Sequence, residues 1–315
     1  MQHRLLPRSR AVLASCLCTV ALACSSADAA PEAGRARKLH VVQGLGFPES
    51  VRYDPEQDVY FVSNMVGPGS DKDGNGYIVR IPAGELGPAT IFVQGGRGGA
   101  VLDAPKGMAL QGDTLWVTDI DVLRGFHRHT GAPLAVLDLR PQGAVLLNDV
   151  AAGPDGLRVT DTGIAMTRKG VLYRGGDKIF AVGPGRAVTR MAQGKELRRP
   201  NGITWDPEGR RWIVVSFHPF RSEVYTVGAD GRRTVLASGL GKFDGVERLA
   251  DGRLLVTAWS DSSLHVFDGK RGGRVIRDLW QPADLGVDTR RGRVAIPLVL
   301  QGRMEVWQLP GRTGG

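Results

Sequence analysis

The chain has 315 residues, of which 42% are hydrophobic and 23% are charged, and its formal net charge at pH 7 is +9. This composition is ordinary for a folded soluble protein, and the basic residues form neither a dense block nor a stripe with aromatic residues, so we expect no nucleic-acid partner. The 44 glycines and 18 prolines are spread along the chain. They indicate many turns rather than one disordered tract, which favours an all-β fold built from short strands.

The first 30 residues have the pattern of an export signal. A basic start is followed by an apolar run, Ala11 to Ala23, that is too short to span a bilayer. Ala27-Asp28-Ala29 fits ordinary signal cleavage, whereas Ala21-Leu22-Ala23-Cys24 resembles a bacterial lipobox and would put a lipid anchor on Cys24. We therefore expect an exported protein, periplasmic or secreted, without a transmembrane span in its mature form. The alternative is a membrane-anchored lipoprotein.

All three cysteines of the chain, Cys16, Cys18 and Cys24, lie in this export segment. The folded part therefore has no disulfide framework and no cysteine-ligated zinc. We expect residues 1–30 to form the signal peptide, 31–38 a short linker, 39–310 one folded domain and 311–315 a tail. We expect this domain to act as a monomer.

An internal repeat organises the chain from residue 47 onward. Six segments share an apolar strand, a turn with Gly or Asp, and a second strand that ends in polar residues; they begin at Phe47, Ala104, Leu147, Pro200, Phe243 and Pro282. Each continues into a third strand, and most reach a fourth. Four strands per unit at a period of about 40–45 residues are typical of a β-propeller, so we predict six four-stranded blades.

The sixth unit ends at its third strand, near Leu309, and lacks a fourth. Residues 39–45 (LHVVQGL) resemble the predicted fourth strand at 234–240 (TVLASGL) and precede the first unit. We predict that residues 39–45 pair with the last blade and close the ring. Closure would remove the exposed sheet edges that an open array of blades leaves.

The innermost strand of each propeller blade lines the central channel, so its first residue lies at one mouth of that channel. The six equivalent positions, called the register residues below, are Glu49, Lys106, Asn148, Asn201, Asp244 and Ala283. Four of them carry side-chain oxygens, and none is a histidine or cysteine, which favours a calcium ion over zinc or copper. The alternative is a set of turns in which each Asn or Asp bonds to its own backbone.

Four short motifs around these positions resemble the calcium site of the gluconolactonase/regucalcin (SGL) family, which is related to paraoxonases and diisopropylfluorophosphatase. The motifs are Pro48-Glu49, Leu147-Asn148-Asp149, Pro200-Asn201-Gly202 and Phe243-Asp244-Gly245. The resemblance implies hydrolysis of lactones or organophosphoesters, with calcium bound by Glu49, Asn201 and Asp244. It also implies that Asn148 binds metal or substrate. Asp149 matches an aspartate that follows the equivalent asparagine in paraoxonases, so we take it as a candidate substrate contact.

The sequence departs from paraoxonases at the second register position. Their proposed histidine base lies in a Pro-His-Gly motif, where this chain has Pro105-Lys106-Gly107. We expect Asp244 to act as ligand and as base or nucleophile. Lys106 is a second candidate catalytic residue and a candidate substrate contact, with a structural ion pair as the alternative. The loops that follow the second strand of each blade should form the rim of the site, and we call them the rim loops. On them, Asp121, His218 and Trp259 are candidate substrate contacts, with solvent exposure or packing as the alternative role.

Two functions remain open from the sequence. The first is a calcium-dependent lactonase or esterase-type hydrolase of a small molecule, in which the metal polarises the substrate oxygen. The second is a non-catalytic binding propeller similar to NHL-repeat proteins.

The loop from Asp71 to Ile78 begins like an EF-hand calcium loop, but Pro82 stands where the terminal glutamate belongs. We interpret it as a polar loop, with a second calcium site as the alternative.

Overall fold

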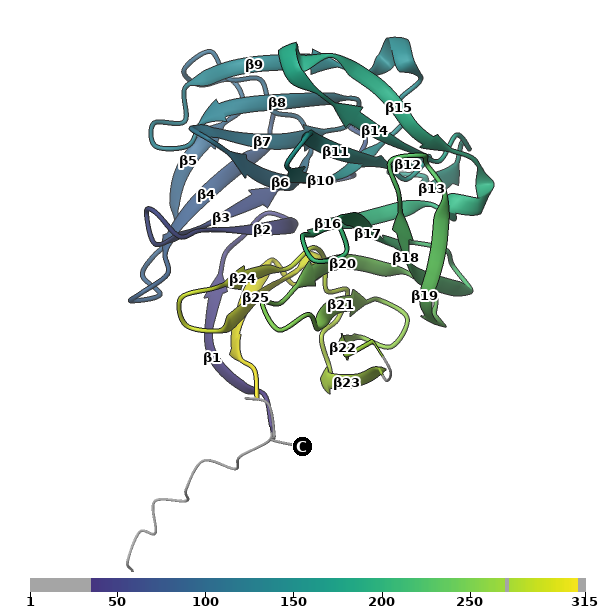
Figure 1. The fold of residues 1–315 in the computed structure, drawn as a ribbon. Helices are drawn as coiled ribbons and strands as arrows, with labels where there is room; N and C mark the ends of the chain where they lie inside the picture. The colour runs from purple at the N-terminus through teal and green to yellow at the C-terminus, as the bar shows by residue number, and fades with distance from the viewer. Residues whose placement is uncertain (1–34, 270–271, 311–315) are drawn as a thin grey trace, which may run out of the picture. The chain divides into compact units, whose positions relative to one another are not determined.

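The computed structural model describes residues 35–269 and 272–310 (Figure 1). They form six four-stranded antiparallel sheets and one two-stranded hairpin. The predicted signal peptide (1–30) and tail (311–315) lie outside the described residues. None of the described helices has the length and hydrophobicity needed to cross a bilayer.

Each four-stranded sheet is one blade of a β-propeller. Blades 1 and 2 contain β2 (Pro48–Asp54), β3 (Val59–Asn64), β4 (Tyr77–Pro82) and β5 (Thr90–Gln94), then β6 (Pro105–Gln111), β7 (Thr114–Asp119), β8 (Val122–His127) and β9 (Pro133–Asp138). Blades 3 and 4 contain β10 (Leu147–Gly153), β11 (Gly156–Asp161), β14 (Lys178–Val182) and β15 (Val188–Gln193), then β16 (Pro200–Asp206), β17 (Arg211–Ser216), β18 (Arg221–Val227) and β19 (Arg233–Leu240). Blade 5 contains β20 (Phe243–Arg248), β21 (Leu254–Ala258), β22 (Ser263–Phe267) and β23 (Gly272–Ile276).

Blade 6 joins the two ends of the described chain, and this confirms the predicted ring closure. It consists of β24 (Gly286–Asp288), β25 (Arg293–Leu298), β26 (Arg303–Gln308) and β1 (Arg37–Gln43). The closing strand begins at Arg37 rather than at residue 39, because its antiparallel pairing with β26 already starts opposite Gln308. The six blades and the closing strand were therefore predicted correctly, with a shift of two residues at the closing strand.

The faces of neighbouring blades pack on each other through separate apolar clusters. One such cluster combines Phe61 and Ile78 of blade 1 with Met108 and Leu115 of blade 2, all 2% exposed or less. Equivalent clusters lie between the other neighbouring blades. Because burial of apolar surface is worth about 25 cal/mol per Å², these interfaces hold the ring together without a disulfide.

The innermost strand of five blades has a β-bulge at its register residue. The pairing with the second strand skips residues between Pro48 and Ser50 in blade 1, and the equivalent interruption recurs in blades 2 to 5. In blade 6, Pro282 makes an isolated bridge with Leu298, and the regular strand starts only at Gly286. A bulge releases a residue from the ladder and re-aims its side chain. The register residues can therefore turn toward a common point.

The insertion in blade 3 forms a hairpin that the sequence analysis did not identify. It consists of β12 (Ile164–Thr167) and β13 (Gly170–Tyr173), lies between β11 and β14, and pairs only with itself. Its two turn residues, Arg168 and Lys169, are not one of the Gly- or Asn-containing pairs typical of hairpin turns, so the sequence carries no clear signal for it.

Candidate functional site

All six register residues line one small cavity at the mouth of the channel. The cavity has a volume of about 30 Å³, and its lining includes Glu49, Lys106, Asn148, Asn201, Asp244 and Ala283 together with apolar residues. The structure thus brings together side chains from all six blades, as the repeat predicts. The volume is comparable to the share of liquid volume of one water molecule, about 30 Å³.

Four oxygens in this cavity are buried and accept no hydrogen bond. They belong to side chains that are 2–6% exposed: Glu49 Oε2, Asn148 Oδ1, Asn201 Oδ1 and Asp244 Oδ1. Leaving a buried polar atom without a partner costs about 1–3 kcal/mol. The turn alternative requires these Asn and Asp oxygens to accept a backbone N–H, which they do not do here. Their chemistry fits a ligand that supplies positive charge to all four.

The electrostatics of the mouth also favour a cation. Burial raises the pKa of Glu49 well above its usual range, and the carboxylate of Asp244 raises it further. Burial and the carboxylates of Asp284 and Asp149 raise the pKa of Asp244 in the same way. Two carboxylates and two amide oxygens are hard ligands of the type that calcium takes. In the described parts of the chain, no three or more His, Cys, Asp or Glu side chains group to hold a metal, so any site here depends on the two asparagines.

Lys106 lies in the same cavity but is not free to move there. It is 1% exposed, and its Nζ donates to the carbonyl oxygens of Gly69 (2.7 Å) and Ala104 (2.9 Å). Burial lowers the pKa of Lys106 to about 8, although the nearby carboxylate of Glu49 acts in the opposite direction. The ammonium group therefore ties the rim loop of blade 1, residues 65–76, to the first strand of blade 2.

The glycines that follow three register residues are required by packing. A Cβ on Gly107 would lie 2.2 Å from Asp149 Oδ1, and one on Gly202 would lie 2.6 Å from the carbonyl oxygen of Asp244. A Cβ on Gly245 would lie 2.7 Å from the Cα of Asp284. In each case the obstacle belongs to the next blade. The Lys-Gly, Asn-Gly and Asp-Gly pairs thus let adjacent bulges approach closely, and none of these glycines has the positive φ of a turn glycine.

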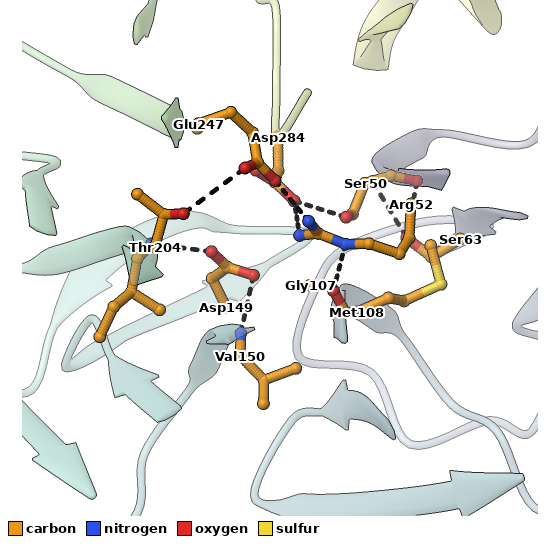
Figure 2. Close-up of polar contacts among 12 residues, drawn as sticks. Ser50, Arg52, Ser63, Gly107, Met108, Asp149, Val150, Thr204, Glu247 and Asp284 are labelled. Carbon is orange, nitrogen blue, oxygen red and sulfur yellow. Dashed lines mark hydrogen bonds and ion pairs between the residues drawn. The ribbon is translucent and has the colours of Figure 1, made fainter. Parts of the chain in front are cut away.

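Asp149 lies in a deeper layer of the channel, beside Asp284 (Figure 2). Its carboxylate accepts hydrogen bonds from the backbone N–H groups of Val150 (2.7 Å) and Ile203 (2.8 Å). Burial raises its pKa, and Asp284 adds to this effect. It does not line the mouth cavity, so the structure separates it from the register residues.

A single guanidinium lies at the centre of this deeper layer (Figure 2). Arg52 donates through Nε to the carbonyl oxygen of Met108 (2.7 Å), pairs with Glu247, and has Nη2 4.0 Å from Asp284. Asp284 also accepts a hydrogen bond from Ser50 Oγ (2.6 Å), and burial raises its pKa to about 7. Sequence reasoning missed this cluster, because no motif in one strand shows which charges of the other blades face it.

Threonines of the second strands hold the register residues in place. The hydroxyl of Thr118 donates to the carbonyl oxygen of Asn148 (2.7 Å), and that of Thr160 donates to the carbonyl oxygen of Asn201 (2.6 Å). Thr257 makes the same bond to Ala283 (2.9 Å). Each bond joins one blade to the next. The triplets Val-Ser-Asn and Val-Thr-Asp recur at the ends of the second strands, and this pattern in the sequence could have revealed the shared hydroxyl position.

Of the three predicted rim contacts, Trp259 alone lines the cavity. Its ring packs edge-on against Phe217 with 5.1 Å between centroids. His218 instead lies beside Arg198, whose Nη2 is 3.3 Å from Nδ1, and burial together with that cation lowers the pKa of His218. Asp121 accepts a hydrogen bond from Lys72 Nζ at 2.5 Å. Neither of these two side chains is part of the cavity lining.

The loop from Asp71 to Ile78 shows no cage of converging ligands. Asp73 accepts a hydrogen bond from Asn75 Nδ2 (2.6 Å), and Asp71 lies 3.6 Å from the guanidinium of Arg168. The backbone N–H of Gly74 donates to Asp103 (2.9 Å). These contacts support the interpretation as a polar loop.

Solved structures share this fold at low sequence identity. A gluconolactonase from Xanthomonas campestris matches with a TM-score of 0.66 and 16% identity, over 89% of this chain and 96% of its own. A luciferin-regenerating enzyme matches with a TM-score of 0.62 and 12% identity, over 87% and 96%. A chain of the nidogen–laminin complex matches with a TM-score of 0.55 and 22% identity, over 72% and 80%. Comparison with curated proteins finds no match.

A family model gives the more specific result. The model of the SMP-30/gluconolactonase/LRE-like region matches residues 47–286, which include all six register positions. This confirms the resemblance seen in the four register motifs, and it supports a lactonase-type hydrolase at the level of the family. The chain therefore belongs to the SMP-30/gluconolactonase/LRE-like family of six-bladed β-propellers.

Proposed function

We propose that this protein is an exported, monomeric, calcium-dependent hydrolase of lactones or related esters. One observation carries the proposal: four buried oxygens without hydrogen-bond partners meet in one cavity, and they come from four different blades. Family membership supports the type of reaction.

The four side chains would hold the metal as an incomplete set of ligands. Calcium takes six to eight oxygens at about 2.3–2.6 Å, so water and substrate would complete the set. Glu49 and Asp244 supply two negative charges, which balance a divalent ion, while Asn148 and Asn201 supply neutral oxygens. When bound, the metal acts as a Lewis acid that polarises the carbonyl oxygen and lowers the pKa of water.

Asp244 is the residue best placed to handle the proton. In the proposed step, the oxygen of a water forms a bond to the carbonyl carbon, and Asp244 accepts the proton that this water loses. The ring C–O bond of the lactone then breaks, and Asp244 returns the proton it accepted to the leaving oxygen, which restores the carboxylate. The bulge at Asp244 and the close approach of Gly202 to its carbonyl oxygen constrain the backbone that carries this side chain.

Lys106 supports the site without contacting the reacting atoms. Its bonds to Gly69 and Ala104 use two of its three N–H groups and hold the rim loop over the mouth. We therefore assign it a positioning role. His218 and Asp121 point into other contacts, so we assign them no step.

A non-catalytic binding propeller is the second candidate. The match to a chain of the nidogen–laminin complex shows that this fold also occurs in protein–protein complexes. The buried oxygens favour the enzyme, because a surface that only binds a protein gains nothing from unpartnered polar atoms at the bottom of a cavity.

The test uses the purified mature protein with a panel of lactones, carboxylic esters and phosphoesters. We expect turnover that is lost on chelation, restored by calcium and abolished in Asp244→Ala. The exposed substitution Glu85→Gln is the matched control and should leave the rate unchanged. Turnover that survives both chelation and Asp244→Ala would overturn the proposal. Tight capture of a protein partner without any turnover would favour the binding propeller.

Export is tested separately, by fractionating cells and determining the mature N-terminus. Cleavage after Ala29 or Ala30 supports ordinary secretion, whereas a lipid on Cys24 that is lost in Cys24→Ser supports the lipoprotein. An uncleaved cytoplasmic chain would contradict both.

A further inference from the structure

The walls above the register residues are apolar. Six side chains complete the cavity lining: Met65, Ile164, Met166, Phe217, Trp259 and Val299. They come from the rim loops of blades 1 and 3 to 6, and five of them belong to a single apolar cluster. A substrate that reaches the four oxygens must therefore place the rest of its structure against carbon and sulfur atoms.

The cavity offers few polar groups to the rest of a substrate. The unpartnered oxygens of Glu49, Asn148, Asn201 and Asp244 are assigned to the proposed metal, and Lys106 uses two of its three N–H groups on backbone carbonyls. The indole N–H of Trp259 is buried without a hydrogen-bond partner, and the side-chain amides of Asn148 and Asn201 carry further N–H donors. These few donors cannot bond all the hydroxyls of a sugar lactone, so some hydroxyls would be buried without partners against the apolar walls, which is unfavourable.

The β12–β13 hairpin closes the mouth from the side of blade 3. Its Met166 exchanges two hydrogen bonds with Ser70 of the rim loop: Met166 N donates to Ser70 Oγ (2.9 Å), and Ser70 N donates to Met166 O (3.1 Å). The 30 Å³ that remain beneath are too small for a lactone ring, so part of the rim has to open when substrate enters, and we take the hairpin as that part. Gly163 at one end and Gly175 and Gly176 at the other have φ of 66°, 77° and 83° and can serve as hinges.

One face of this hairpin extends the apolar wall outward. Residues directly opposite each other on paired strands share a face, and here Ile164 pairs with Tyr173 and Met166 with Val171. The first member of each pair lines the cavity, whereas Val171 and Tyr173 are 58% and 41% exposed. An apolar track therefore runs from the cavity to the surface.

We propose that the site takes lactones or esters that carry an apolar substituent, with the β12–β13 hairpin closing over that substituent, and that it rejects polyhydroxylated sugar lactones. This inference rests on the proposed function for its reaction and on the walls for its specificity. The family name refers to gluconolactone, a polyhydroxylated sugar lactone, whereas the inferred substrate of this protein is apolar.

The first test compares initial rates of the calcium-loaded protein on a δ-lactone with an alkyl side chain and on D-glucono-1,5-lactone. We expect kcat/KM to favour the alkyl lactone by about 10-fold or more, as is ordinary for burial of a few methylenes. Met166→Gln, which keeps the side-chain length, should lower this preference mainly by raising KM for the alkyl lactone. Leu172→Gln on the opposite face of the hairpin is the control and should behave as wild type. A preference for the sugar lactone, or equal effects of the two substitutions, would overturn the inference.

The second test separates this inference from the proposed function. Non-hydrolysable lactams, one alkyl-substituted and one polyhydroxylated, are titrated calorimetrically into the calcium-loaded protein. Tighter binding of the alkyl lactam that is weakened in Met166→Gln supports the apolar site even if no lactone is hydrolysed, in which case only the proposed reaction fails. Equal binding or a preference for the polyhydroxylated lactam overturns the inference whatever the rates are.

Discussion

Glu49 of blade 1 and Asp244 of blade 5 line the same buried cavity, and each carboxylate has one oxygen without a hydrogen-bond partner. Burial raises the pKa of both groups, and Asp244 raises that of Glu49 further. Two such groups at one point are unfavourable unless a cation lies between them. This arrangement is the physical reason for placing a metal at the mouth.

Lys106 should contribute to the stability of the fold independently of any ligand. In Lys106→Met, the buried carbonyl oxygens of Gly69 and Ala104 lose their donor, and each such loss costs about 1–3 kcal/mol. We expect a lower free energy of unfolding in urea for the metal-free variant than for metal-free wild type. Unchanged stability would show that the hydrogen bonds of the Lys106 ammonium group do not hold the rim loop of blade 1 in place.

The threonine bonds between blades should control the geometry of the mouth. Thr160→Val removes the donor to Asn201 and the acceptor for the N–H of Asp149 while keeping the shape of the side chain. Valine fits this location, because Val215 occupies the matching place in blade 4. We expect a loss of about 1–3 kcal/mol of stability and weaker calcium binding.

The control for this experiment is Thr226→Val in the third strand of blade 4. Its hydroxyl makes one long bond of 3.5 Å, to the carbonyl oxygen of Thr234, away from the mouth. Calcium affinity should stay at the wild-type value in this variant. Equal affinities in both variants would contradict the role of Thr160.

Asp58 and Arg291 hold the seam at which blade 6 meets blade 1, and this pair should make stability depend on pH. Arg291 Nη2 lies 2.6 Å from Asp58 Oδ2, and these hydrogen bonds lower the pKa of Asp58 to about 2. The unfolded value is about 3.9, so the pair stabilises the fold above pH 4 and loses this effect as the pH falls toward 2. Urea unfolding at pH 6 and pH 3 should show a smaller acid loss in Asp58→Asn than in wild type. A parallel loss in both proteins would contradict the assignment.

The repeat made most of the fold predictable. Each blade carries its own copy of the same pattern, so alignment of the copies gave both the number of blades and the register residues. The missing strand after Leu309 and the unassigned strand at 39–45 could only be reconciled by closing the ring. The structure agrees, with the closing strand at Arg37–Gln43.

The rest depends on contacts that one copy of the repeat does not contain. The β12–β13 hairpin occurs in one blade, so no other copy gives its register. Thr118 and Asn148 are 30 positions apart, and Thr160 and Asn201 are 41 apart, so their bonds require knowledge of how the blades pack. The same holds for Arg52, whose partner Glu247 lies in blade 5.

Calcium content measured by elemental analysis tests the central claim most directly. Wild type purified in calcium should retain one ion per chain, and binding at 100 times Kd should add about 2.7 kcal/mol of stability. Glu49→Gln should lose both the ion and the stabilisation, whereas the exposed control Glu85→Gln should keep them. Wild type that holds no calcium, or Glu49→Gln that retains it in full, would contradict the account.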